Sequence, residues 1–410
     1  MMENERRFYE DYLVTQVLPF WEHAFDEEFG GLFTCWTNDG VKLVSTDKYT
    51  WSQARMLWCL SYMLLNRELT EETRKRYIHW AKGLYDLLSD NALLAGDDEG
   101  CAFLLERDGS PKEPNPGSGL YTSIYADCFV IMAFGRWAEV TSNAQVANQA
   151  LALYEKSTGL IKKGIIKTDP YPIEAGHRSM GVHMILANTA SELATALAHF
   201  NQKASEQVAK DATVQARLIL DEFVDRERMQ LREVVSEGGS ESSTLERHRN
   251  PGHSVECMWF LLDILKDERV DEMERILLNA LHLGWDGQYG GLLRYVDCEG
   301  GAPAGKEGSD AFTTLVKTTW DYKLWWPHAE ALWATWRCYQ ATGNEELLTW
   351  YHKIKDYTFQ TFPAEQGMEW IQIRRRDGEA QEGVVALPVK DPYHIIRILL
   401  FFTTGQGVQR

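Results

Sequence analysis

The stretch GGLFTCWTNDG, residues 30–40, decides the fold, because it is the clearest copy of a pattern that returns along the chain. Two glycines begin it, a β-prone run follows, and Asp39-Gly40 ends it with a hairpin signal. Residues 50–66 then carry apolar side chains at intervals of three and four, which predicts a helix. The pattern therefore predicts a short ribbon that leads into helices.

The same arrangement recurs through the rest of the sequence. Similar ribbons that end in an acidic residue and a glycine lie at residues 100–109, 290–300 and 367–378, and weaker counterparts lie at residues 159–167 and 231–239. Helical periodicity covers the long segments 50–66, 71–89, 123–141, 182–200, 212–224, 254–266, 325–342 and 345–361. Together these give about six units, roughly 60–80 residues apart, and such spacing indicates a repeat architecture.

Six helix pairs can stack as an open solenoid or close into a ring. The ends of the chain carry no polar capping repeat, so we expect an all-α fold, the (α/α)6 barrel, with short β-hairpins at one end. No linker rich in Pro, Gly or Ser divides the sequence, so we expect a single catalytic domain over residues 1–410. In such a barrel the loops at one end surround a central pocket, and the polar segment 236–249 is a candidate lid.

Composition argues against several classes of function. The formal net charge of −18 repels phosphate backbones, so nucleic acid is not an expected partner. No apolar stretch approaches the roughly 18 residues that a membrane span needs, and the charged N-terminus lacks a signal peptide's apolar region. We therefore expect a cytoplasmic protein without a membrane partner. Its seven cysteines include no Cys-x-x-Cys pair, which favours reduced thiols over disulfides or a zinc site.

The segment Asn-Pro-Gly-His-Ser-Val-Glu-Cys-Met-Trp, residues 250–259, is the first that carries chemistry. Pro and Gly mark a turn that begins a helix, which puts His253 in the first turn, Glu256 on the same face and Trp259 further along. A carboxylate beside an imidazole orients the ring and raises its proton affinity. A capping histidine, with Glu256 favouring the helix dipole, would explain the same residues without catalysis.

The segment Lys-Asp-Pro-Tyr-His-Ile-Ile-Arg, residues 390–397, repeats this arrangement near the C-terminus. Pro392 again precedes a helix, His394 begins it, and Arg397 lies one turn further along the same face. A His/Arg pair at the start of an apolar helix is unusual for a surface helix. Ordinary capping together with a solvated arginine would also account for the pattern.

The segment Lys-Leu-Trp-Trp-Pro-His-Ala-Glu, residues 323–330, offers a surface on which a sugar can stack. Trp326 supplies an aromatic face, and His328 and Glu330 supply hydrogen-bonding groups beside it. Core packing of the two tryptophans is the alternative reading of this segment.

Two further polar residues interrupt apolar helices. His183 lies in the segment 180–188, where a lone histidine is more often a satisfied core residue. Arg55 lies in the segment 51–58, and a buried arginine needs either a carboxylate partner or a ligand oxygen. All of these segments begin a helix just after a loop, so in a barrel we expect their side chains to converge on one pocket.

At these motifs the sequence resembles the N-acylglucosamine 2-epimerase family, which includes renin-binding proteins, cellobiose 2-epimerases and related aldose–ketose isomerases. The resemblance spans nearly the whole chain, and it includes the ribbon at residues 30–33, Thr-Asp-Lys-Tyr-Thr-Trp at residues 46–51, Tyr-Ala-Asp at residues 125–127 and the histidine motifs above. It implies an (α/α)6 barrel, in agreement with the repeats. It also implies that His253 and His394 are the catalytic bases.

The motifs and the resemblance together define a predicted set of substrate-binding and supporting residues. These are Arg55, His183, Glu256, Trp259, Trp326, His328, Glu330 and Arg397. Two details depart from the acylglucosamine branch of the family. That branch usually has Phe-His-x-Pro-Arg where this chain has Tyr-His-Ile-Ile-Arg, and a histidine at position 183 is more typical of the isomerases and cellobiose epimerases.

We therefore expect a sugar 2-epimerase that interconverts N-acetylglucosamine and N-acetylmannosamine. One histidine would take the C2 proton of the open-chain sugar to give an enediolate, and the other would return a proton to the opposite face. A mannose/fructose-type aldose–ketose isomerase and a cellobiose or mannose 2-epimerase are the alternatives. A glycoside hydrolase that uses Glu256 and Glu330, or a non-catalytic binding protein, is less favoured.

No metal or cofactor is expected to be required, because the sequence lacks the carboxylate-rich cluster typical of Mg²⁺ or Mn²⁺ sites. The resemblance implies that ATP can act as an allosteric activator that is not consumed. The sequence contains no Walker-type phosphate loop, so no cofactor-binding residue is assigned. The resemblance also implies a homodimer whose ligand is a small sugar.

Overall fold

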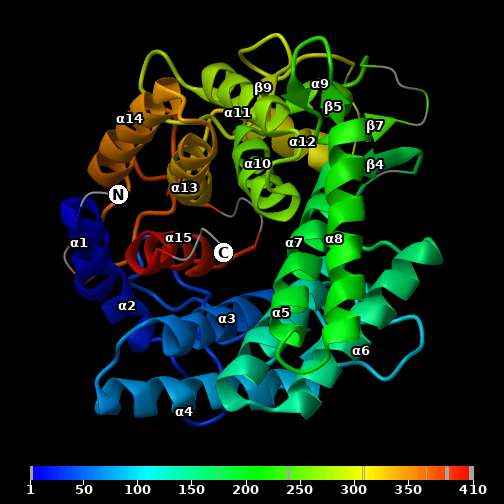
Figure 1. The fold of residues 1–410 in the computed structure, drawn as a ribbon, viewed down its shortest axis with the longest axis vertical. Coiled ribbons are helices and arrows are strands. Elements are labelled where there is room, and N and C mark those ends of the chain that lie inside the picture. Colours follow the sequence, from blue (N-terminus) through cyan, green and yellow to red (C-terminus); the bar gives the residue numbers. More distant parts are fainter. Residues whose placement is uncertain are drawn as a thin grey trace.

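The structure is a computed structural model that describes residues 3–173, 175–236, 238, 241–306, 308, 310–365, 367–383 and 387–405. Within these residues the long helices form two concentric rings (Figure 1). The inner ring consists of α3 (Thr50–Asn66), α5 (Ile124–Thr141), α7 (Met180–Leu197), α10 (Pro251–Leu265), α13 (Trp325–Thr342) and α15 (Tyr393–Thr404). The outer ring consists of α1 (Glu3–Tyr12), α4 (Glu71–Leu87), α6 (Ala144–Lys162), α8 (Gln202–Glu222), α11 (Val270–Gly284) and α14 (Glu345–Thr361).

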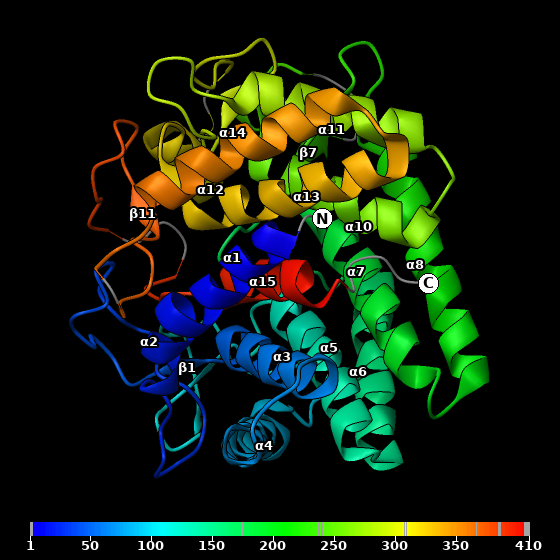
Figure 2. The same ribbon diagram turned by 60° about the vertical axis from the view of Figure 1, so that its left-hand side comes forward.

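The inner ring closes through the two ends of the chain. Each inner helix packs against the next, and α15 packs against both α13 and α3. The outer partner of α15 is α1, from the opposite end of the sequence, and Figure 2 shows these two helices side by side. The N- and C-terminal segments thus share the last helix pair, and this pairing converts a row of hairpins into a barrel. The predicted (α/α)6 barrel is confirmed.

The two rings differ in how much of each helix is buried. In α10, 12 of 15 residues are buried, so this inner helix is covered on all sides. In α11, which has the same length, the six buried residues recur at intervals of three and four and form one stripe. Polar side chains are therefore costly along the inner helices, and those that occur there need partners.

Short antiparallel ribbons gather at one end of the barrel. The pairs are β1 (Lys48–Tyr49), β2 (Leu104–Leu105) and β3 (Pro111–Lys112) in one sheet, β4 (His177–Ser179) with β7 (Val234–Ser236), β5 (Val224–Asp225) with β6 (Gln230–Leu231), β8 (His248–Arg249) with β9 (Val296–Asp297), and β10 (Lys323–Leu324) with β11 (Ile373–Arg374). Strands β1, β4, β8 and β10 lead at once into α3, α7, α10 and α13. The ribbons therefore surround the N-terminal ends of the inner helices.

The Gly-Gly-Leu pattern has a physical cause that is visible in two of the repeats. Gly30 and Gly31 have φ of 71° and 84°, and Gly290 and Gly291 have φ of 73° and 77°, a left-handed conformation that favours glycine. Each turn is held by a buried lysine that precedes an inner helix. The Lys48 Nζ donates to the Gly30 carbonyl at 2.6 Å and to Asp26 Oδ2 at 3.1 Å. In the second copy the Lys323 Nζ lies 3.2 Å from Asp286 Oδ2.

Several sequence predictions need correction. The weak ribbon predicted at residues 159–167 is wrong, because α6 continues to Lys162. Val296–Asp297 does not pair across the turn at residues 299–300 but with β8, a strand from the preceding repeat. The helix predicted over residues 212–224 begins at Gln202, where Asn201 caps it. The candidate lid at residues 236–249 contains the short helix α9 (Thr244–Arg247) and β8, while residues 237, 239 and 240 lie outside the described residues.

The remaining short elements connect the rings: the π-helical turns η1 (Leu13–Val17) and η2 (Leu88–Ala92), α2 (Leu18–Glu22) and α12 (Ala311–Thr319). All seven cysteines are buried and unpaired. In the part of the chain that the structure describes, no helix has the length and apolar character needed to cross a bilayer.

Candidate active site

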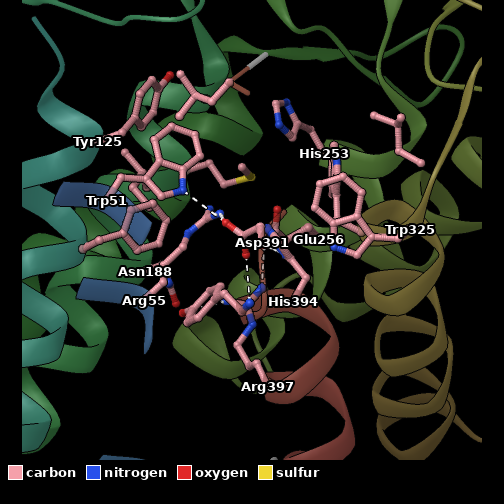
Figure 3. Close-up of a pocket in the computed structure, with 18 of the residues that line it drawn as sticks. Trp51, Arg55, Tyr125, Asn188, His253, Glu256, Trp325, Asp391, His394 and Arg397 are labelled. Carbon is pink, nitrogen blue, oxygen red and sulfur yellow. Dashed lines mark hydrogen bonds and ion pairs between the residues drawn. The ribbon is translucent and has the colours of Figure 1, made fainter. Parts of the chain in front are cut away.

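A cavity opens at the end of the barrel that carries the ribbons. About 1100 Å³ of space lies within it, a figure that includes open solvent at the mouth. Helices from both halves of the chain line it, and Figure 3 shows the labelled side chains pointing toward one centre. Of the sequence-predicted site residues, those that line it are Arg55, His253, Glu256, Trp326, His394 and Arg397.

His253 lies in the first turn of α10, as predicted. Asn250 caps this helix by accepting a hydrogen bond from the His253 backbone N–H at 3.1 Å. The ring Nδ1 lies 2.9 Å and 3.0 Å from the two carboxylate oxygens of Glu233, a buried residue beside strand β7. Burial disfavours a charged imidazole, but the Glu233 carboxylate outweighs it and raises the pKa of His253. This pairing leaves Nε2 as the ring nitrogen available to a ligand.

His394 lies in the first turn of α15, inside a buried ion cluster. Its Nδ1 lies 2.7 Å from Glu330 Oε1. The Arg397 Nη2 donates to Glu330 Oε1 and to Glu256 Oε1, both at 2.6 Å. Burial alone would raise the pKa of Glu330, but the Arg397 and His394 charges outweigh it and lower that pKa. Three helices, α10, α13 and α15, therefore hold His394 through charged partners.

Trp326 lies between the two histidines. Its ring centroid is 5.2 Å from that of His253 and 5.6 Å from that of His394, with interplanar angles of 38° in both pairs. Gly252 allows this close packing, because a Cβ at that position would lie 2.6 Å from the Trp326 ring. One indole thus links two imidazoles that are far apart in the sequence, and it fixes their spacing at the cavity wall.

Arg55 forms an ion pair with a carboxylate in the cavity wall. Its guanidinium forms an ion pair with the buried Asp391, and Trp51 Nε1 donates to the same carboxylate at 3.4 Å. Burial would raise the pKa of Asp391, but the Arg55 charge outweighs it and lowers that pKa. The guanidinium also lies 4.1 Å from the Phe129 ring centroid and 4.4 Å from that of Trp51. Arg55 and Arg397 are therefore both neutralised before any substrate binds.

The ion cluster also has the composition of a metal site. Glu256, Glu330 and His394 offer ligand atoms that all lie within 4.8 Å of one another. This group was not predicted from the sequence, because its members come from three separate motifs. The Arg397 guanidinium already bridges both carboxylates, so it supplies the positive charge that a cation would bring.

Four of the predicted substrate-binding and supporting residues lie outside the cavity lining, and one of them, Glu330, contacts His394 from behind. The His183 Nδ1 lies 2.8 Å from Gln215 Oε1 on the outer helix α8. His328 is fully buried; its Nε2 accepts the Leu292 N–H at 2.8 Å, and burial lowers its pKa to about 3. Glu330 and Trp259 lie behind the wall, where Trp259 Nε1 donates to Glu330 Oε2 at 2.9 Å.

Two carboxylates at the site were missed by the sequence analysis. Glu233 belongs to Leu-Arg-Glu-Val-Val, residues 231–235, where a single acidic side chain within a short apolar run was the available signal. Asp391 stands inside the quoted motif at residues 390–397 but received no role. Its position directly before Pro392 suited a capping residue, and its Oδ1 does accept the Tyr393 backbone N–H at 2.8 Å.

Comparison with known proteins gives the same assignment over nearly the whole chain. The sequence model of N-acylglucosamine 2-epimerase (GlcNAc 2-epimerase) matches residues 31–397. N-acylglucosamine 2-epimerase of Bos taurus is 31% identical over 393 residues, which are 94% of this chain and 87% of the bovine protein. Cellobiose 2-epimerase of Eubacterium cellulosolvens is 22% identical over 95% of each chain.

A solved structure agrees with the fold. Cellobiose 2-epimerase from Bacillus thermoamylovorans superposes with a TM-score of 0.75 at 19% identity, over 98% of this chain and 99% of that one. The match of the family model spans both histidine motifs and every inner helix up to the start of α15. The chain therefore belongs to the N-acylglucosamine 2-epimerase family and is an enzyme of the epimerase kind.

Proposed function

We propose that this protein interconverts N-acetylglucosamine and N-acetylmannosamine by moving a proton at C2, with His253 and His394 as its two acid/base groups. One observation carries the proposal: both imidazoles line one cavity, and each has its Nδ1 held by a glutamate. Each ring is thereby left with Nε2 for the substrate. An acid and a base on opposite sides of one carbon are the minimum needed to invert it.

The carbonyl of the open-chain sugar makes this chemistry possible. It acidifies the proton on C2, and loss of that proton leaves a planar enediolate. One histidine removes the proton from one face, and the other, already protonated, delivers a proton to the opposite face. Imidazole suits both tasks because its ordinary pKa of about 6.5 lies close to neutral pH.

Two glutamates, Glu233 and Glu330, orient the histidines by hydrogen bonds. Glu233 and Glu330 accept hydrogen bonds at Nδ1, which fixes the tautomer and leaves the Nε2 lone pair of a neutral ring free to act as the base. Arg397 neutralises the carboxylates behind His394, and at 2.6 Å from both it keeps them from repelling each other. Trp326 supports both imidazoles from the side.

The geometry disfavours a glycoside hydrolase. Such an enzyme needs two carboxylates on opposite sides of the scissile bond. Glu256 and Glu330 contact the same guanidinium nitrogen, so they lie on one side of the cavity. A cellobiose or mannose 2-epimerase is the second candidate, favoured by the full-length similarity to the Eubacterium cellulosolvens enzyme. An aldose–ketose isomerase would differ only in returning the proton to C1.

We further propose that catalysis requires no metal or cofactor and that ATP, where it acts, acts as an allosteric activator. The family resemblance supports this, as it supports a homodimer. We also propose a cytoplasmic protein with one domain over residues 1–410, as expected from the sequence. The net charge of −18 argues against nucleic acid as a partner. Sedimentation velocity and an ATP titration of the epimerisation rate test these points.

The test of the proposed function is incubation in D₂O with N-acetylmannosamine, N-acetylglucosamine, mannose, glucose and cellobiose, with and without ATP. Inverted product with deuterium at C2 of the acylamido sugars is the expected result. A ketose product would replace the proposal with an isomerase. Inversion of cellobiose or mannose alone would favour the second candidate, and cleaved cellobiose without exchange would contradict both.

A further inference from the structure

The cavity has two walls of different chemistry. One wall carries the histidines, Trp326 and the ion cluster. The other comes from α5 and α7 and is mainly apolar, and Figure 3 shows Asn188 on that side together with Trp51 and Tyr125, away from His253. We infer that the α5–α7 wall is the subsite for the acyl group at C2, with Asn188 as its polar contact and Met184 and Ile185 as its apolar boundary. This inference rests on the proposed function.

Helical geometry selects the residues of this wall. Gly181, Met184, Ile185 and Asn188 follow the i, i+3, i+4, i+7 spacing, so they share one face of α7, and all four line the cavity. Phe129 continues the apolar surface on the neighbouring helix α5. Gly181 contributes no side chain, and a Cβ at this position would lie 3.3 Å from the Tyr125 hydroxyl and 3.7 Å from Glu233 Oε1.

Asn188 is the unusual member of this face. It is buried, and its Nδ2 donates only to the Met132 sulfur at 3.4 Å, which is a weak acceptor. No hydrogen bond to the Asn188 Oδ1 is formed by the described residues. Because Asn188 lines the cavity, its amide oxygen is placed to accept a hydrogen bond from a ligand there. The side chain therefore points to a ligand that has an N–H or O–H to donate, and the apolar neighbours on the same face select between them.

An acylamido group has the chemistry that this wall requires. Its N–H can donate to the Asn188 Oδ1, and its alkyl end can contact Met184, Ile185 and Phe129. A sugar with a hydroxyl at C2 would leave the apolar part of the wall in contact with water. The wall therefore favours an acylamido sugar over a simple aldose, and the size of Ile185 limits the length of the acyl chain.

The chain offers a matched pair of variants for the test. Ile185 and Ile373 both line the cavity and are 7% and 8% exposed, but Ile373 belongs to strand β11 and not to α7. The measurement is the ratio of kcat/KM for N-butanoylmannosamine to that for N-acetylmannosamine. Ile185→Ala should raise this ratio about tenfold or more. An apolar pocket typically discriminates between substrates that differ by one methylene by about that factor in kcat/KM. Ile373→Ala should leave the ratio within about twofold of the wild-type value.

Each outcome has a separate meaning. A ratio raised by Ile373→Ala and not by Ile185→Ala, or raised equally by both, overturns the subsite while leaving the proposed function intact. Wild-type protein that inverts mannose or cellobiose but no acylamido sugar overturns the subsite and the proposed substrate together. Wild-type protein that exchanges no C2 proton in any of these sugars overturns the proposed function itself. If Ile185→Ala fails to fold, Ile185→Val and Met184→Ala are measured in the same way.

Asn188→Leu provides an independent readout of the polar contact. This change removes the amide while keeping a similar volume, so kcat/KM for N-acetylmannosamine should fall about 10- to 100-fold with an unchanged melting temperature. Unchanged kinetics in this variant would overturn the role of Asn188.

Discussion

The two histidines of the site are held in contrasting ways. The side chain of His253 is 25% exposed, and a single carboxylate, Glu233, reaches it from a short ribbon. The side chain of His394 is 9% exposed and belongs to a cluster of two glutamates and an arginine from three inner helices. The two surroundings therefore have different effects. The carboxylate from the ribbon raises the pKa of His253, and the buried cluster between the inner helices holds the ring of His394 in position.

The largest expected effect comes from removal of either imidazole. His253→Ala and His394→Ala should each reduce the epimerisation rate by about 10³-fold or more, because each removes an acid/base group that the inversion needs. His183→Ala is the matched control, since that ring contacts Gln215 and lies outside the cavity lining, and its rate should stay within a few-fold of wild type. Comparable losses in all three variants would contradict the assignment.

The next effect distinguishes the two environments by stability. Glu330→Ala leaves Arg397 and His394 without their shared carboxylate, and loss of one member of a buried ion cluster typically costs about 3–5 kcal/mol. Glu233→Ala should cost less, because its partner His253 is more exposed than His394. Urea unfolding at pH 8 measures both. Equal losses of unfolding free energy in the two variants would contradict the difference between the two histidine environments.

The sequence predicted the barrel because its repeats are periodic, and α3, α13 and α14 begin and end where periodicity placed them. Closure of the ring by α1 and α15 was not visible, because it depends on contacts between the two ends of the chain. The histidines were found because each follows a turn signal. Glu233 was missed because its contact with His253 is long-range and joins a ribbon to a helix.

His183 and His328 lie outside the cavity lining for one geometric reason. Both belong to motifs at the start of an inner helix, and for His183 the family resemblance implied a place in the pocket. Side chains two positions apart on a helix point in nearly opposite directions, so the face that contains Gly181 and Met184 excludes His183. In the same way Trp326 faces the cavity while His328 points behind it. Helical periodicity within each motif is therefore the signal that separates these residues.

A smaller expected effect is a shift in the pH dependence of kcat/KM when Glu233 is replaced by glutamine. Because Glu233 raises the pKa of His253, Glu233→Gln should lower that pKa. In the direction in which neutral His253 removes the proton, kcat/KM rises with pH through this pKa, so the rising limb should move to lower pH. A limb that stays in place would mean that Glu233 does not control His253.

The same pair makes a matching prediction for stability, because the folded-state pKa of His253 lies above its unfolded value. The stabilisation from this pair should be fully present below about pH 6.5 and should be lost as the pH rises through the folded-state pKa. As the pH rises from about 6.5 through the folded-state pKa of His253, the difference in unfolding free energy between wild type and Glu233→Gln should therefore become smaller. If this difference in unfolding free energy instead grew with pH, the ion pair between Glu233 and protonated His253 would not be the source of the stabilisation.

The most direct test of the central claim is C2 hydrogen exchange in D₂O by the two single-histidine variants, starting from each pure epimer. If the histidines act on opposite faces, each variant retains one base, so each should exchange the C2 proton of one epimer only, without inversion, and the two variants should prefer opposite epimers. Exchange of both epimers by one variant, or the same preference in both variants, would contradict the two-histidine account.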